Sequence, residues 1–258
     1  MPLPDFVIIG AMKCGTSTLA AQLAAQPGVF MTTPKEPNFF SDDAVFARGL
    51  PWYESLFAAA AEGDLKGEAS THYAKLPTHP HAAARLHAAV PDARLIYLTR
   101  DPVERLISHY IHEWTMGTIS CGLEEAVERH PELIDYGRYE MQLAPWRRLF
   151  GEDRLLRLTL EDMEADPQGT LDRVAAFLGR PGAFAWREER ARENASAERL
   201  RKFPLYDLIV EHPVPAALRR ALVPKRLREA VKARLRMRER PALSEAARAR
   251  LAARLAEG

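Results

Sequence analysis

A short apolar run that ends in glycine, close to the start of the chain, constrains the fold more than any other feature. The run, Phe6–Gly10, is continuous, rich in β-branched residues and too short for a helix. Such a run is typical of a buried strand in a parallel sheet. The alanine- and leucine-rich residues that follow, up to Pro27, predict a helix, and residues 16–18 offer N-cap side chains. A strand, a glycine turn and a helix in this order indicate an α/β fold.

The rest of the chain continues this alternation. Further strands are predicted at residues 29–31, 66–69, 94–99 and 154–160, and further helices at 80–90, 102–116, 139–150 and 166–178. This order predicts one P-loop-like, three-layer α/β domain with a mostly parallel central sheet flanked by helices. We expect the core to span residues 1–185. Residues 186–258 are expected to form a loop and a basic helical C-terminal extension that packs on the same domain.

Composition narrows the class of protein. A chain of 258 residues that is 47% hydrophobic can bury one large core. Two cysteines, Cys14 and Cys121, do not make a disulfide framework, and no Cys/His cluster has zinc-ligand spacing, so no metal is expected. No apolar run approaches the ~18 residues of a membrane span, and no targeting segment is evident. We therefore expect a cytoplasmic protein.

The end of the chain is basic. Residues 186–258 carry 19 Lys and Arg against 10 Asp and Glu. Because the arginines alternate with Glu and Ala at helical spacing, a solvated helix face is the favoured interpretation, and no nucleic acid partner is expected. A weak peripheral contact with an anionic membrane stays open as an alternative, and the oligomeric state is not addressed by the sequence.

The loop after the first strand has the geometry of an anion site. A turn between a strand and a helix directs backbone N–H groups and the helix dipole toward one point. The nucleoside triphosphate loop, G-x-x-x-x-G-K-[ST], needs a lysine after its second glycine. Here Thr16 occupies that position and Lys13 lies inside the loop. This difference argues against a triphosphate. The alternative to an anion-binding loop is a tight turn with an exposed lysine.

A second anion site is predicted where the strand at residues 94–99 ends. Arg100 follows that strand, and Ser108 comes about two helical turns later. Ligands of doubly wound sheets collect at the carboxyl ends of the strands, where a guanidinium binds phosphate in a planar, bidentate manner. The alternative role for Arg100 is a surface ion pair with Asp101 or Glu104.

Together these two segments resemble the sulfotransferase family that uses 3′-phosphoadenosine-5′-phosphosulfate (PAPS). The stretches Pro34-Lys-Glu-Pro-Asn-Phe-Phe40 and Gly67-Glu-Ala-Ser-Thr-His-Tyr73 are similar to segments of its heparan sulfate and bacterial carbohydrate branch. Further similar segments, in the family's order, are residues 136–139, 161–162, 177–179, 194–196 and 240–244.

The resemblance implies a PAPS site without a metal, and 3′-phosphoadenosine-5′-phosphate (PAP) as the product. The residues implied around the 5′-phosphosulfate are Lys13, Cys14, Gly15, Thr16, Ser17 and Thr18. Arg100 and Ser108 are implied for the 3′-phosphate. Arg201 and Lys202 are the nearest match to a late phosphate loop, without its glycine. Lys13 is also implied as a catalytic group, and Cys14 is expected to be mildly acidified by the helix N-terminus.

On the acceptor side, the resemblance implies Glu36 as general base, and Pro37 is expected to keep residue 36 extended. Histidine is the base in another branch, which leaves His72 and His109 as alternatives. The residues expected to contact the acceptor are Lys35, His72, Tyr73, Tyr136 and Tyr139. The expected function is transfer of a sulfuryl group to a hydroxyl or amine of a carbohydrate or other small metabolite.

Two other functions stay open. In a P-loop kinase or NTPase, Lys13 would contact β- and γ-phosphates beside Mg²⁺, but the chain lacks both the lysine at position 16 and a convincing apolar strand that ends in aspartate. A non-catalytic nucleotide-binding protein would use the basic residues 219–240 to dock a partner.

Overall fold

A five-stranded, wholly parallel sheet forms the centre of the protein, for which the computed structural model describes residues 3–191 and 240–256. The strands are β1 (Phe6–Gly10), β2 (Val29–Met31), β3 (Leu65–Ala69), β4 (Arg94–Thr99) and β5 (Leu155–Thr159). Their order across the sheet is β2-β3-β1-β4-β5. The predicted parallel α/β architecture is confirmed, and every residue of the central β1 is buried.

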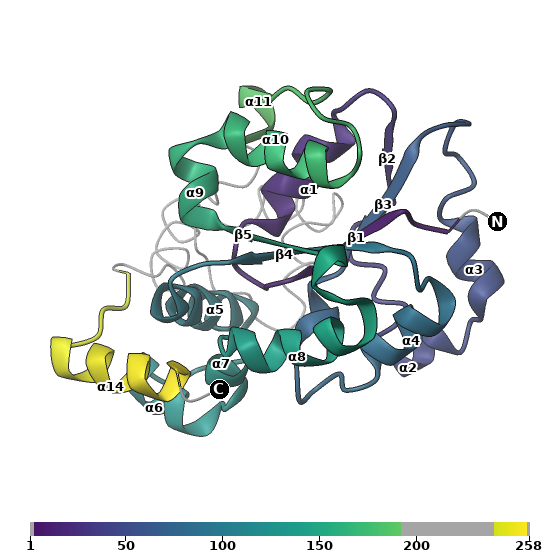
Figure 1. Ribbon diagram of the computed structural model, residues 1–258. Helices are drawn as coiled ribbons and strands as arrows, with labels where there is room; N and C mark the ends of the chain where they lie inside the picture. Colours follow the sequence, from purple (N-terminus) through teal and green to yellow (C-terminus); the bar gives the residue numbers. More distant parts are fainter. Residues whose placement is uncertain (1–2, 192–239, 257–258) are drawn as a thin grey trace, which may run out of the picture.

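Helices cover both faces of the sheet, as Figure 1 shows. One face carries α1 (Thr16–Ala24), α9 (Leu160–Ala165), α10 (Pro167–Phe177) and α11 (Glu188–Ala191). The other carries α4 (Ala82–Ala89) and α8 (Tyr139–Phe150), which pack against each other. Four of these helices, α1, α4, α8 and α10, were predicted and are confirmed to within a few residues, because each has the length and the terminal signals that a periodic pattern requires.

Short elements were not predicted. They are α9, α11, α2 (Asp43–Phe46), α3 (Leu50–Ser55), α6 (Leu123–Arg129), α7 (Glu132–Asp135) and the 3₁₀ helices η1 (Thr71–Ala74) and η2 (Glu152–Arg154). One or two helical turns are too few to show an amphipathic period. None of the described helices is both long and apolar enough to cross a membrane.

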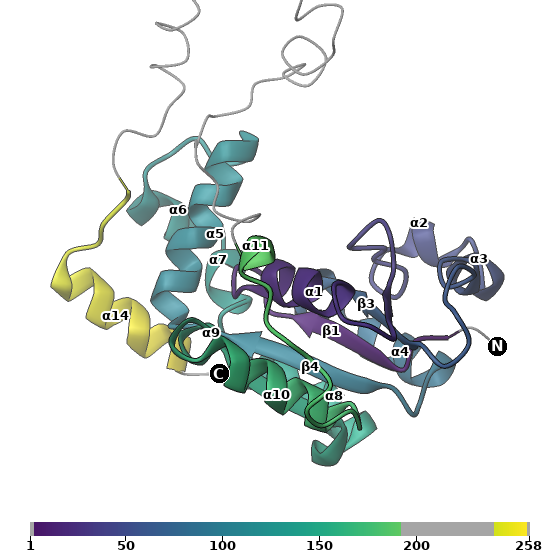
Figure 2. The ribbon, with the colours of Figure 1, turned by 90° about the horizontal axis from the view of Figure 1, so that it is seen from above.

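A smaller helical cluster packs beside the carboxyl edge of the sheet and has its own apolar core. It consists of α6, α7, α5 (Pro102–Met116) and α14 (Glu245–Ala256), and Figure 2 shows α14 alongside α5. Leu251 and Leu255 of α14 are buried in this core. Arg248 forms ion pairs with Asp101 and Glu104 at the start of α5. The last part of the chain is thereby anchored close to the end of β4.

The start of α1 differs from the sequence prediction. Its N-cap is Gly15, with a φ of 87°, and no side chain caps the helix. A left-handed conformation favours glycine, and a Cβ at this position would lie 2.7 Å from Cε of Met163. The hydroxyl groups of Thr16–Thr18 therefore do not cap the helix. The N-cap of α5, by contrast, is a side chain, since Asp101 accepts a hydrogen bond from the Glu104 N–H at 2.8 Å.

Glu68 on β3 is a carboxylic acid inside the hydrophobic core. It is 0% exposed, and neither of its oxygens has a well-aligned hydrogen-bond partner among the described residues. Burial raises its pKa to about 8, an effect that the nearby hydroxyls of Tyr73 and Tyr53 only partly offset. The side chain is therefore largely protonated at neutral pH.

This raised pKa makes stability depend on pH. Between its ordinary pKa near 4.5 and the folded value of about 8, folded Glu68 holds a proton that the unfolded chain releases, so stability falls as pH rises through this window. We expect Glu68→Gln, which resembles the neutral acid, to remove this slope. The free energy of unfolding in urea should fall between pH 5 and pH 8 by about 4 kcal/mol more in the wild type than in the variant. Equal pH slopes for the two proteins, with the exposed Glu62→Gln as control, would contradict the assignment.

Candidate functional site

A polar pocket of about 640 Å³ lies where the five strands end. Every strand contributes to it through the segment that follows its carboxyl end. Its lining residues are Met12, Lys13, Gly15, Thr16, Ser17 and Thr18 after β1, Lys35 and Glu36 after β2, Thr71, His72 and Lys75 after β3, Arg100 after β4, His112 on α5, and Leu160 after β5. Since the carboxyl ends of a parallel sheet are where ligands of this architecture bind, this pocket is the candidate functional site.

The loop after β1 and the start of α1 form one wall. The first N–H groups of α1 have no carbonyl partner within the helix and no side-chain cap. Lys13 has a φ of 69°, a left-handed conformation that is costly for a residue with a side chain. Lys13, Gly15 and the first three residues of α1 all line the pocket. This wall combines N–H donors, the positive end of a helix dipole and an ammonium group, as an anion site requires.

Arg100 lies in the same pocket, after the neighbouring strand β4. The two predicted anchors are thus brought together by the pairing of β1 with β4 in the sheet. Ser108 is half-buried on α5, one helical turn before His112, but it does not line the pocket itself. The ion-pair alternative for Arg100 is not seen among the described residues, where Asp101 and Glu104 pair with Arg248 instead.

Tyr139 connects the two anchors and does not line the pocket as an acceptor wall would. Its hydroxyl donates to the Arg100 carbonyl at 2.8 Å and accepts from the Arg100 N–H at 3.2 Å. The same oxygen lies 3.6 Å from Sγ of Cys14. Tyr139 is thus a positioning residue that holds the backbone at the end of β4 against the loop after β1.

For the PAP site that the sequence resemblance implies, Tyr139→Phe is expected to weaken PAP binding by about 10-fold, because the partly buried N–H and C=O of Arg100 lose a hydrogen-bond partner. Calorimetric titration with PAP measures this. The matched control is Tyr97→Phe, because the Tyr97 hydroxyl is buried beside Tyr139 without a hydrogen-bond partner among the described residues. Similar PAP affinities in the two variants would show that the Tyr139 hydroxyl does not position Arg100.

The environment of Cys14 contradicts the expected acidification. Its side chain is 0% exposed and does not line the pocket. Burial raises the pKa of the thiol to about 11, against the opposing effects of the Tyr139 hydrogen bond and of the Arg105 and Arg100 charges. The helix N-terminus does not outweigh this desolvation. Cys14 packs under the loop as a small neutral residue.

Glu36 is held rigidly in the pocket. Its N–H donates to the Ala69 carbonyl at 3.0 Å, which ties the loop after β2 to β3. Its carboxylate accepts hydrogen bonds from the Thr71 N–H at 2.7 Å and the Thr71 hydroxyl at 3.2 Å, and it forms an ion pair with Lys35. The expectation of an extended residue 36 is wrong, because Glu36 has a φ of 61°. Two hydrogen bonds to Thr71 stabilise this left-handed turn and direct the carboxylate.

Of the two alternative bases, only His72 lines the pocket. Burial, followed by the charge of Lys75, lowers the pKa of His72 to about 4, so it is neutral at pH 7. His109 is 2% exposed, stacks on Tyr136 and lies 3.5 Å from a Glu113 oxygen. Burial also lowers the pKa of His109 to about 4.

Tyr73 and Tyr136 do not line the pocket. Tyr73 is 1% exposed and packs edge-on against Phe40 in the core. The Tyr136 hydroxyl is 2.6 Å from the Thr78 hydroxyl, and its ring lies 5.5 Å from Nζ of Lys75. The expectation that either ring forms a direct acceptor wall is therefore corrected: Tyr73 is a core residue, and Tyr136 supports Lys75 from behind.

Three polar pocket residues were missed as site residues. Thr71 orients Glu36, Lys75 is a buried cation and His112 lies on α5. A rule that polar residues just after a predicted strand belong to the site would have found Thr71 and Lys75. His112 follows Ser108 by one helical turn, so helical spacing was its signal. Arg201 and Lys202 lie outside the described residues, and within those residues no cluster of three or more His, Cys, Asp or Glu side chains is placed to hold a metal ion.

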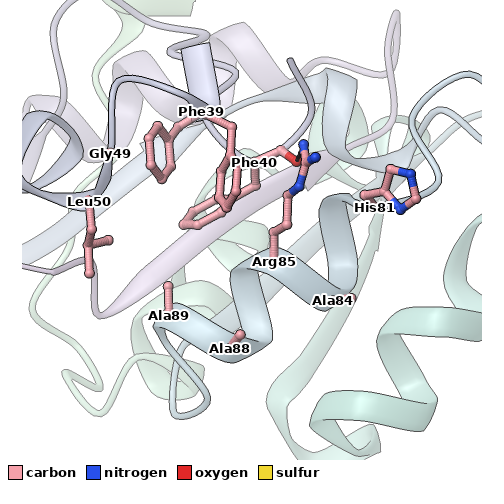
Figure 3. A pocket seen from close by; sticks show the side chains of 10 residues that line it. Phe39, Phe40, Gly49, Leu50, His81, Ala84, Arg85, Ala88 and Ala89 are labelled. Atoms are coloured by element: carbon pink, nitrogen blue, oxygen red, sulfur yellow. Dashed lines mark hydrogen bonds between the residues drawn. The ribbon is translucent and has the colours of Figure 1, made fainter. Parts of the chain in front are cut away.

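A second hollow of similar volume lies between α4 and the Phe39-Phe40 segment, and Figure 3 shows it. Its walls are mainly apolar, with the guanidinium of Arg85 as the main polar group. That guanidinium pairs with Asp43 at 2.7 Å and stacks on Phe46. The hollow lacks the grouped cations and the carboxylate of the first pocket, so it does not compete as the reaction site.

Comparisons with known proteins agree with this geometry. Residues 3–222 match the family model described as "Sulfotransferase domain". Heparan sulfate glucosamine 3-O-sulfotransferase 3A1 of Mus musculus is 34% identical over 189 residues, which cover 69% of this chain and 46% of that protein. Heparan sulfate glucosamine 3-O-sulfotransferase 6 of Homo sapiens is 32% identical, over 68% of this chain and 52% of that protein. The chain thus spans about half the length of these relatives.

Solved structures show the same fold. A sulfotransferase from Alicyclobacillus acidocaldarius superposes with a TM-score of 0.62 and 28% identity, over 75% of this chain and 90% of that one. A sulfotransferase domain from the curacin biosynthetic pathway superposes with a TM-score of 0.52 and 17% identity, over 99% and 98% of the two chains.

Proposed function

Because this chain belongs to the sulfotransferase domain family, we propose that it transfers the sulfuryl group of PAPS to an acceptor hydroxyl or amine. The observation that carries the proposal is the composition of a single pocket. The ammonium of Lys13, the guanidinium of Arg100 and the carboxylate of Glu36 all line it, at the ends of three different strands. A donor with two phosphate positions needs two cationic anchors, and transfer needs a base.

The donor is proposed to lie across β1 and β4. The N–H groups at the start of α1 and the ammonium of Lys13 suit the 5′-phosphosulfate. Arg100, held by Tyr139, suits the 3′-phosphate. Sequence similarity alone supports Ser108, Arg201 and Lys202 as further phosphate contacts.

The chemistry is an in-line displacement at sulfur. Glu36 takes the proton of the acceptor group as its oxygen or nitrogen forms a bond to sulfur. The bond between sulfur and the 5′-phosphate oxygen breaks, and the charge left on that phosphate is stabilised by Lys13 and the α1 N–H groups. Since Lys35 and Thr71 both bind the Glu36 carboxylate, the base is held in place before the acceptor arrives.

A carbohydrate is the proposed acceptor. Two of the similar proteins are named as acting on glucosamine of heparan sulfate, and Glu36 lies in a segment of this chain that resembles their branch. The segments after β2 and β3 form the side of the pocket opposite the donor anchors, since β3 lies between β2 and β1. This side is where a sugar hydroxyl would meet Glu36.

The decisive experiment is calorimetric titration of the protein with PAP and, separately, with ATP and Mg²⁺. We expect binding of PAP that does not need a metal, and ATP–Mg²⁺ binding that is much weaker. Tight binding of ATP–Mg²⁺ together with no binding of PAP would favour the kinase or NTPase alternative. PAP binding without transfer from PAPS to any member of a carbohydrate panel would favour the non-catalytic alternative.

A further inference from the structure

Lys75 is the one cation of the described pocket lining that is nearly fully buried, and the proposed reaction leaves it without a role. Its side chain is only 7% exposed. The ring of Tyr136 lies 5.5 Å from its Nζ, and among the described residues no carboxylate forms an ion pair with it. A buried charge is costly unless it is paired, so a protein gains stability by replacing such a lysine with an apolar residue. A lysine kept here, at the wall of a ligand pocket, suggests a ligand that supplies the missing charge.

The position of Lys75 separates it from the donor anchors. Lys13 and Arg100 follow β1 and β4, whereas Lys75 and His72 follow β3 and Glu36 follows β2. In the order β2-β3-β1-β4-β5, the donor anchors therefore lie on one side and Lys75 lies with the proposed base on the other. A group bound at Lys75 belongs to the molecule that presents its hydroxyl or amine to Glu36.

The surroundings of Lys75 favour an anion. The charged and titratable groups that face it are Glu36, Glu113, Arg105, Lys35, His72, His79, His109 and His112. The two carboxylates have other partners: Glu36 is bound by Lys35 and Thr71, and Glu113 lies 3.5 Å from His109. His72 and His112 both line the pocket beside Lys75 and can donate or accept hydrogen bonds.

We propose that Lys75 forms a subsite that binds an anionic substituent of the acceptor, a carboxylate or a sulfate ester, next to the group that receives the sulfuryl group. This inference rests on the proposed function and narrows its acceptor from carbohydrates in general to anionic ones. Tyr136 supports the Lys75 ammonium from behind through its ring face. Lys75 is thus a specificity residue, and the base and the donor anchors act without it.

The test uses inorganic sulfate as the probe, with the full chain first saturated with PAP. Calorimetry at constant ionic strength should show sulfate binding to the wild type and binding at least 10-fold weaker in Lys75→Met. The matched control is Lys66→Met, since Lys66 lies at the start of β3 and pairs with Asp5 outside the pocket. Both variants should bind PAP like the wild type. The proposed subsite is contradicted if the wild type does not bind sulfate, or if Lys75→Met binds sulfate as tightly as the wild type.

A second arm identifies the source of the anion. An oligosaccharide that alternates uronic acid and sulfated glucosamine should displace sulfate from the PAP-loaded protein, and the same oligosaccharide with its sulfate esters removed and its carboxylates reduced to alcohols should not. Equal displacement by both, or by neither, overturns the assignment to the acceptor. PAP binding is measured before sulfate is added. A wild-type protein that does not bind PAP contradicts the proposed function, and this outcome is distinct from both sulfate results.

The charge of Lys75 gives an independent readout. Burial lowers its pKa to about 8, so the ammonium loses its proton as pH rises above 8. Sulfate affinity of the wild type should fall by about 10-fold or more between pH 7 and 9.5. That fall should be much smaller in Lys75→Met, and an equal fall in both proteins contradicts the role of Lys75. Thermal unfolding of Lys75→Met, or of Lys75→Gln if the first variant misfolds, checks that the fold is retained.

Discussion

Glu36→Gln is expected to lower kcat by about 100-fold or more, with PAP affinity unchanged, because the variant keeps the shape of the side chain and loses the proton acceptor. The amide can still accept the hydrogen bond from the Thr71 N–H, so the loop after β2 should keep its conformation. Steady-state rates with saturating PAPS, together with calorimetric titration with PAP, separate the chemical step from donor binding.

The matched control is Glu152→Gln. Glu152 pairs with Arg147 and precedes β5, at the end of the sheet opposite the pocket. The substitution Glu152→Gln should therefore leave kcat unchanged. Near-normal turnover in Glu36→Gln would instead move the base to His72, the alternative candidate that lines the pocket. In that case His72→Gln, and not Glu36→Gln, should show the large loss of kcat.

Lys13→Met is expected to lower kcat by about 100-fold or more and to weaken PAP binding to a smaller degree. The length of the side chain is conserved, while the charge that stabilises the leaving phosphate is removed. The charge on that phosphate grows as the bond to sulfur breaks, so Lys13 interacts more strongly with the transition state than with the bound donor. Lys13 also holds a left-handed backbone conformation that methionine can share at similar cost.

The separate effects of Lys13→Met on kcat and on KM for PAPS test whether Lys13 stabilises the transition state. A variant that raises KM for PAPS and leaves kcat unchanged would show that Lys13 binds the donor equally in the ground and transition states. Lys66→Met serves again as control, because this lysine lies outside the pocket and its removal should change neither parameter.

Much of the fold was predictable because its main elements carry local signals. Phe6–Gly10 and Arg94–Thr99 are apolar runs with defined ends, and Asp101 and Pro102 mark the start of α5. The short helices α2, α3, α6 and α7 had no such signal, since their positions depend on packing against neighbouring elements. The strand order was likewise not encoded locally, because it depends on which strands pair.

The functional site was likewise predictable from the sequence only in part. Lys13, Arg100 and Glu36 were identified from their segments, and all three line the pocket. Tyr73 and Tyr139 were misassigned because a sequence does not show which way an aromatic ring points.

The sequence by itself determined the strand–loop–helix elements, the two anion-binding segments and the identity of the candidate base, because these depend on residues that are neighbours along the chain. Only the tertiary structure decided that Cys14 is buried and neutral, that Tyr139 joins the loop after β1 to Arg100, and that Lys75 lies buried near Glu36. The physical reason is that burial and hydrogen bonding between distant segments set the charge and direction of these side chains, and both arise only when the parallel strands bring their carboxyl ends together.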